Sequence, residues 1–279
     1  MTRAGRWMLR RGWMYACAIA ISAFSLFPIY YVAITSLKPR SEIYTRTPDL
    51  WPSDPQWSQY TRVLGEGHVG RALLNSLIVA GVSTLIVVVV AGMAAYALAR
   101  LEVPFRRTML MLILTTQMFP LVVLIIPLFV IMRNADLIGT YQGLILAYLA
   151  FTVPLAIWIM RGFIVTIPVE LEQAAMIDGA TRVGAMFRVI LPIAGPGLVA
   201  TGTLSFIAAW NEFMLALTFM NTEERKTLPL VLQQFVGRGD VDWGAVMATS
   251  VIYTLPVVLF FLVLRKRLML GMTAGAVKG

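Results

Sequence analysis

The apolar positions of this chain gather in six long runs. Six stretches of 22 to 28 residues contain no Asp, Glu, Lys or Arg: 12–37, 72–99, 108–132, 137–160, 189–211 and 243–264. An α-helix rises ~1.5 Å per residue and needs about 20 apolar residues to cross the ~30 Å hydrocarbon layer of a membrane. The pattern therefore predicts an all-α membrane protein with six transmembrane helices.

We place the six spans at about 13–37, 72–99, 108–132, 137–160, 194–219 and 243–264. The fifth span extends beyond Glu212 because the apolar sequence continues over 213–220. The first run follows four arginines, but it is too long for the apolar part of a secretory signal and lacks a convincing cleavage site, so it is predicted to be a retained helix. A short N-terminus, 1–12, thus precedes a single transmembrane domain, 13–279.

Composition and charge support this topology. Hydrophobic residues make up 59% of the chain, charged residues 13%, and the mean hydropathy is +0.79, which excludes a soluble globular protein. One side of the predicted topology carries fourteen Lys and Arg against four acids, and the other carries nine against nine. The positive-inside rule assigns the first side to the cytoplasm, so both termini are predicted to be cytoplasmic. The net charge of +9 is then a topology signal and does not indicate nucleic-acid binding.

The loop between the fourth and fifth spans, 161–188, is far longer than a link between neighbouring helices needs. Pro168 suits a first helical turn, 169–177 is predicted to be a short helix, and Gly179 can take a positive φ at its end. A second short helix, 182–190, is expected after Thr181. The loop is therefore predicted to place a helix, a turn and a helix at the cytoplasmic end of the spans.

One face of the first short helix is suited to a protein partner. Leu171, Ala174, Ala175 and Asp178 fall at helical spacing, and the two small alanines would allow close approach. The alternative is an amphipathic helix lying on the membrane surface. That alternative is less favoured, because 169–178 carries three acids and no base.

The same loop carries a family motif. Glu172-Gln173-Ala174-Ala175, three further residues, Gly179 and then Val189-Ile190-Leu191-Pro192 resemble the EAA loop of ABC importer permeases. Ala209-Trp210-Asn211-Glu212-Phe213 and the tail 271–279 resemble the carbohydrate branch, and the likeness to the maltose/trehalose-type inner-membrane subunit covers essentially the whole chain. Gln173 stands where the family usually has Glu, so Glu172 or Asp178 would supply the charge there.

The resemblance implies a type I ABC importer permease with a cytoplasmic coupling helix in the loop 161–192 and a cytoplasmic tail, 265–279. Its partners would be a second homologous permease forming a heterodimer, a dimer of ATP-binding subunits, an extracytoplasmic sugar-binding protein and membrane lipid. The implied ATPase-coupling residues are Glu172, Gln173, Ala174, Ala175, Asp178 and Gly179. The tail would contact the ATPase through Thr273, Gly275 and Lys278.

The chain contains no phosphate loop of the form G-x-x-x-x-G-K-[ST], so we expect it to bind no cofactor and to be no enzyme. ATP and Mg would be used by the partner ATPase. The chain has a single cysteine, Cys17, and a single histidine, His68, which leave little for a metal site or nucleophilic catalysis. The implied function is import of a sugar, with a disaccharide such as trehalose or maltose as the leading substrate, across the inner membrane of a bacterium.

Glu212 is the acid that lies inside an apolar segment. A carboxylate at the membrane centre costs about 2.5–3.5 kcal/mol, so it is expected to face a wet cavity or a partner. Trp210, Asn211 and Glu212 together suit a sugar, because the indole can contact the ring and the other two can accept hydroxyl protons. A structural or gating role of Glu212 is the alternative. Gln117 and Tyr148 are further candidates for the substrate pathway.

Three other functions are open. A secondary, ion-coupled sugar carrier would need internal inverted repeats, which are not evident, and would not explain the loop 161–188. A scaffold subunit without a pathway is the second. The third is an ABC permease for another solute, such as glycerol-phosphate.

Overall fold

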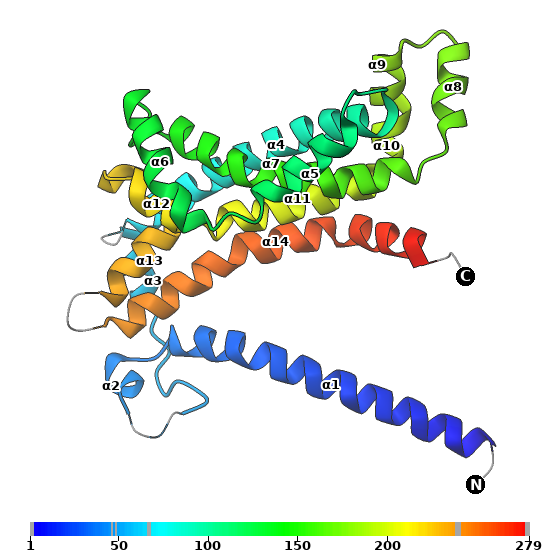
Figure 1. The fold of residues 1–279 in the computed structure, drawn as a ribbon. Helices are drawn as coiled ribbons and strands as arrows, with labels where there is room; N and C mark the ends of the chain where they lie inside the picture. Colours follow the sequence, from blue (N-terminus) through cyan, green and yellow to red (C-terminus); the bar gives the residue numbers. More distant parts are fainter. Residues whose placement is uncertain (1–2, 46, 48, 66–67, 238–240, 277–279) are drawn as a thin grey trace. The chain divides into compact units, whose positions relative to one another are not determined.

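The computed structural model describes the backbone of residues 3–45, 47, 49–65, 68–237 and 241–276, and their side chains except in 3–11 and 266–276. Throughout this part of the chain the regular structure is helical (Figure 1), which confirms the all-α prediction. Contacts group the chain into two compact units. The first comprises Met1–Val69 and Leu232–Leu255, and the second Gly70–Val231 and Pro256–Gly279.

Within the described residues, four helices are long and apolar enough to cross a membrane. They are α1 (Arg3–Thr35), α4 (Val69–Arg100), α7 (Tyr141–Val165) and α14 (Trp243–Ala276). Two bent pairs pass the same test and raise the number to six if each pair is one span. The remaining short helices are α2 (Arg40–Ile43), α3 (Ser58–Gly65), α8 (Val169–Ile177), α12 (Met214–Phe219), the 3₁₀ turn η2 (Glu223–Arg225) and α13 (Leu228–Val236).

The first bent pair lies where the sequence predicts one continuous span, 108–132. Helix α5 (Arg106–Thr116) ends before Gln117, and α6 (Leu121–Asn134) begins after Pro120 at an angle of 97°. Proline has no amide proton and pushes the preceding residue out of the helical region. Pro120 thus breaks the helix inside the apolar run 108–132, although the composition of this run predicts one continuous span.

The second bent pair occupies the loop 182–193 and the fifth predicted span. Helix α9 (Arg182–Ala185) continues through the π-helical turn η1 (Met186–Ile190) into α10 (Leu191–Ile193), and α11 (Gly195–Trp210) leaves at 76°. Pro196 occupies the first turn of α11, where its missing amide proton costs nothing. The predicted span 194–219 therefore consists of α11 and the separate helix α12.

In the first unit, polar contacts fasten the segment after α1. Lys38 is fully buried, its Nζ donates to the carbonyl of Asp49, and it lies 5.5 Å from the ring of Tyr31. The hydroxyl of Tyr30 donates to the carbonyl of Leu50 at 2.6 Å. The segment after α1 is thus held near the end of this helix through the main-chain acceptors of Asp49 and Leu50.

The second unit is built around α4, α7 and α11, with α8 and α9 at one end and α6 and α12 at the other (Figure 1). Helices α7 and α11 pack so closely that a Cβ at Gly197 would lie 2.6 Å from Cγ of Phe163. At the end that carries α8, an apolar cluster joins Tyr96 of α4, Ile164 of α7 and Ile190 of η1. This cluster gives the helix–turn–helix loop a fixed base.

At the opposite end, Asn75 holds a loop to the start of two long helices. Its Nδ2 donates to the carbonyls of Glu224 and Lys226 at 2.9 and 2.8 Å, and its Oδ1 accepts from the hydroxyl of Tyr141 at 2.8 Å. Asn75 is 3% exposed. The loop around η2 is therefore attached to α4 and α7 by one buried amide.

Candidate functional site

The helix–turn–helix predicted in the long loop is confirmed. Pro168, in an extended conformation, precedes α8, which begins at Val169 as predicted. Gly179 takes φ +91°, and its amide donates to the carbonyl of Met176 at 3.1 Å, so the glycine ends the helix in the conformation expected of it. The hydroxyl of Thr181 accepts from the amide of Gly184 at 3.1 Å and caps α9.

The predicted partner face of α8 points away from the protein. Leu171, Ala174 and Asp178 are exposed and Ala175 is half-buried. Gln173 and Gly179 are also exposed. Sequence reasoning missed Ile177, whose side chain is 85% exposed at the end of the helix. An exposed apolar side chain next to two small residues is a further reason to regard this face of α8 as a contact surface.

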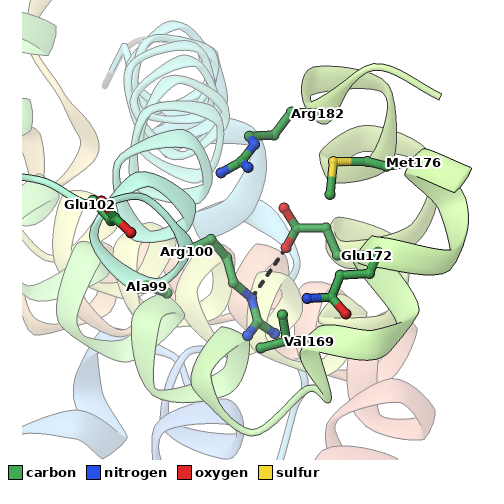
Figure 2. Close-up of a pocket in the computed structure, with 8 residues that line it drawn as sticks. Ala99, Arg100, Glu102, Val169, Glu172, Met176 and Arg182 are labelled. Atoms are coloured by element: carbon green, nitrogen blue, oxygen red, sulfur yellow. Dashed lines mark ion pairs between the residues drawn. The ribbon is translucent and has the colours of Figure 1, made fainter.

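Glu172 points the other way, into the protein. The hydroxyl of Tyr96 donates to its Oε1 at 2.5 Å. The Oε2 atom of Glu172 lies 3.5 Å from Nε of Arg100, as the dashed line in Figure 2 marks. The side chains of Arg100 and Glu172 are only 6% and 4% exposed. We call Glu172, Arg100 and Tyr96 the polar bridge.

Arg100 also reaches the end of α7. Its Nη2 donates to the carbonyl of Ile164 at 3.1 Å and to that of Ile167 at 2.5 Å. The last carbonyls of a helix have no partner within the helix and attract cations. Arg100 therefore connects α4, the end of α7 and α8. Tyr96 and Arg100 are four residues apart on α4. This spacing places both side chains on one face of the helix, and it is the sequence signal from which their pairing could have been predicted.

A cavity of about 570 Å³ lies between the end of α4 and α8. It is lined by Ala99, Arg100, Glu102, Val169, Glu172, Gln173, Met176 and Arg182 (Figure 2). Glu102, Gln173 and Arg182 are exposed at its rim, whereas Arg100 and Glu172 lie on its floor. The space next to Arg100 and Glu172 is thus bordered by exposed polar residues from α8, α9 and the segment after α4.

Glu212 caps a helix. Its two carboxylate oxygens accept from the amides of Leu215 and Ala216 at 2.8 and 3.1 Å, at the start of α12. An acid at a helix N-terminus is favourable because it faces unpaired amides and the positive end of the dipole. This contact accounts for the acid within an apolar segment and favours the structural alternative.

The other pathway candidates lie in different environments. Trp210 is 1% exposed and its ring is stacked on Phe206, with the centroids 5.6 Å apart. Asn211 is exposed, and its Nδ2 donates to the carbonyl of Ile207. Gln117 is exposed in the break between α5 and α6 and donates to the carbonyl of Phe151 at 3.2 Å, while Tyr148 is buried within α7. Asn211 and Gln117 are thus the candidates with accessible polar groups.

The candidates in the C-terminal tail cannot be placed in the site. Thr273 and Gly275 fall in the last turns of α14, where the structure describes the backbone and no side chains. Lys278 lies outside the described residues. Their contact with an ATPase stays a prediction.

Known proteins resemble this chain over most of its length. Residues 88–272 match the family described as "Binding-protein-dependent transport system inner membrane component". The sulfoquinovosyl glycerol transport system permease protein SmoH of Agrobacterium fabrum is 37% identical over 254 residues, 91% of this chain and 89% of that protein. The trehalose transport system permease protein SugB of Mycobacterium tuberculosis is 38% identical over 261 residues, 93% of this chain and 94% of that protein.

The fold is also similar to a solved structure. A chain from the crystal structure of a bacterial ABC transporter involved in the import of the acidic polysaccharide alginate superposes with a TM-score of 0.77 at 26% sequence identity. The match covers 95% of this chain and 98% of that chain.

Proposed function

This chain belongs to the family of inner membrane components of binding-protein-dependent transport systems, and on that premise we propose that it is the permease subunit of an ATP-driven importer for a sugar. The observation that carries the proposal is α8, a helix with an exposed face of small and apolar residues that is fixed at its base to the ends of α4 and α7. Such a helix can receive a movement from a partner and pass it on to long apolar helices.

The energy for transport comes from a partner. The chain has no phosphate loop, so ATP is hydrolysed with Mg by two ATP-binding subunits, one of which docks on α8. Leu171, Ala174, Ala175 and Ile177 form the apolar contact, with Gln173 and Asp178 as polar neighbours. A second homologous permease completes the pathway, and an extracytoplasmic binding protein delivers the sugar. In this arrangement the chain crosses the membrane six times, with α5 and α6 as one span and α11 and α12 as another, and both termini are cytoplasmic.

We infer that the sugar is a disaccharide, with trehalose as the first candidate. The relatives reported above transport trehalose and sulfoquinovosyl glycerol according to their names, so carbohydrate is the shared class. Asn211 and Gln117 offer exposed amides to hydroxyl groups. The side chains of Trp210 and Tyr148 are buried behind the residues that line the pathway, and Glu212 caps the start of α12.

The proposal is tested by purifying the chain with the products of its neighbouring genes and reconstituting the complex in proteoliposomes. We expect ATP hydrolysis that is stimulated by the binding protein loaded with trehalose, together with uptake of radiolabelled trehalose. Deletion of 174–179 should abolish both, because it removes the exposed face of α8. Stimulated hydrolysis that survives this deletion would contradict the importer function.

A parallel measurement addresses the rivals and the substrate. Uptake driven by an ion gradient in vesicles that contain this chain alone would establish a secondary carrier instead. A thermal-shift screen of the purified binding protein against trehalose, maltose and glycerol 3-phosphate identifies the solute. A shift with glycerol 3-phosphate alone would contradict the sugar proposal.

A further inference from the structure

We propose that Glu172 is a positioning residue inside this permease, which ties α8 to α4 and α7, and that it makes no contact with the ATPase. The inference rests on the proposed function, since it concerns how a movement of α8 reaches the spans. It differs from what the EAA resemblance implies, because there Glu172 belongs to the docking residues. The structure assigns docking to the exposed residues of the same helix.

The first argument is burial and charge. The Glu172 side chain is 4% exposed, its Oε1 already accepts from Tyr96, and its Oε2 faces Arg100. An external basic side chain would have to compete with Arg100, a charged partner that is already buried beside the carboxylate. Breaking a buried ion pair leaves an uncompensated charge away from water, which is strongly unfavourable. The carboxylate is therefore committed to its internal partners.

The second argument is the position of Arg100. Its guanidinium faces Glu172 with Nε and donates through Nη2 to the carbonyls of Ile164 and Ile167 at the end of α7. The planar guanidinium has five donors in a fixed arrangement, so one residue can hold several acceptors at set angles. A displacement of Glu172 is thus passed to α4 and to the end of α7 through one rigid group.

The third argument is the cavity. Helix α8 packs mainly on η1 and α9. Between α8 and the end of α4 lies the cavity of about 570 Å³, and Arg100 and Glu172 of the polar bridge line it. Apolar packing is incomplete there, so the ion pair and the tyrosine hydroxyl supply the link between these two helices. Networks of this kind can carry coupling between sites.

The test compares two Glu→Gln substitutions on α8 in the whole reconstituted complex. Glu172→Gln removes the buried charge and keeps an acceptor for Tyr96. Glu170→Gln makes the same chemical change at an exposed position two residues earlier. Because docking uses the exposed face, we expect Glu172→Gln to retain the wild-type amount of co-purifying ATPase. Loss of the ATPase from this variant would overturn the proposal, and this measurement needs no substrate.

Transport efficiency is the second readout. In proteoliposomes with radiolabelled trehalose, Glu172→Gln should raise the ATP hydrolysed per trehalose imported by about tenfold, a typical size for coupling between sites. Glu170→Gln should leave this ratio at the wild-type value. A purely structural defect would lower hydrolysis and import together and leave the ratio unchanged, and that result would also overturn the proposal.

A double-variant cycle identifies the pathway. If Glu172 acts through its bridge partners, combining Glu172→Gln with Arg100→Gln should change the ratio no more than the larger single effect, because interacting residues are not additive. Multiplied effects would show independent roles and refute the bridge. Should Arg100→Gln fail to fold, Tyr96→Phe, which removes one hydroxyl, replaces it in the cycle. A wild-type complex without ATP-driven import would refute the proposed function instead, and the co-purification result would still decide this inference.

Discussion

Replacing Gly197 by alanine tests the close packing of α7 against α11. A Cβ at this position would lie 2.6 Å from Cγ and 2.8 Å from Cβ of Phe163, well inside the distance at which carbon atoms make contact. Overpacking a close-packed interior costs about 1–3 kcal/mol. In a helix, alanine is otherwise better than glycine by about 0.5–1 kcal/mol. The net loss of stability is therefore about 0–2.5 kcal/mol, with a central value of about 1 kcal/mol.

The chain supplies a matched control two residues away. Gly195 is the first residue of the same helix, and a Cβ there would meet nothing within 4 Å. Gly195→Ala should thus keep or raise the melting temperature, measured by tryptophan fluorescence in detergent. Gly197→Ala should lower it by a few degrees, since about 1 kcal/mol corresponds to 2–4 °C at this chain length.

Rescue makes the reasoning specific. Phe163→Ala removes Cγ and Cδ2 from the contact, so Gly197→Ala should cost less stability in the Phe163→Ala background than in the wild type. If Gly197→Ala melts at or above the temperature of Gly195→Ala, the two helices are further apart than described, and the reasoning is wrong.

Three other substitutions address separate parts of the second unit. Asn75→Leu removes three hydrogen bonds of a buried side chain and should lower the free energy of unfolding by about 2–4 kcal/mol, measured by thermal unfolding. Tyr141→Phe removes one of these bonds and should cost about a third as much. Equal losses would contradict the assignment of the loop contacts to Asn75. Gly179→Val forces a β-branched residue into φ +91° and should loosen the end of α8, seen as faster amide hydrogen exchange over 174–180; unchanged exchange would count against that turn. Ile177→Asp alters a side chain that is 85% exposed, so the melting temperature should stay the same. The amount of co-purifying ATPase should fall by at least about tenfold. Retention of the ATPase would place the docking surface elsewhere.

Local signals in the sequence were sufficient for the helix–turn–helix. Pro168 before the helix, Gly179 after it and Thr181 at the start of the next are short-range determinants, and each takes the conformation that its chemistry favours. The apolar runs likewise locate the long helices, because their composition alone meets the length that a membrane requires. The turn signals depend on neighbours within about four residues, and the apolar runs on composition along one continuous segment.

The polar bridge could not be predicted, because it depends on tertiary structure. Tyr96 and Glu172 are 76 residues apart, and nothing local distinguishes Glu172 from its exposed neighbour Glu170. The sequence therefore predicts one acidic, partner-facing helix, whereas the fold separates its acids into buried and exposed ones. A structural role of Glu212 was among the expectations, but its cap could not be located for a related reason, since an acid in an apolar run becomes a cap only when the helix breaks just after Trp210.

The sharp turn between α5 and α6 has a consequence for how this subunit exists in the bilayer. If the pair is one span, residues 117–120 lie at a depth without water, and the first amides of α6 have no preceding helical turn to bond to. Hydrocarbon cannot satisfy such groups, so irregular backbone at that depth occurs only against protein or a water-filled space. Met118 and Phe119 are nevertheless exposed on this chain. If α5 and α6 form one span, another protein surface or an aqueous channel must therefore cover residues 117–120 of this subunit.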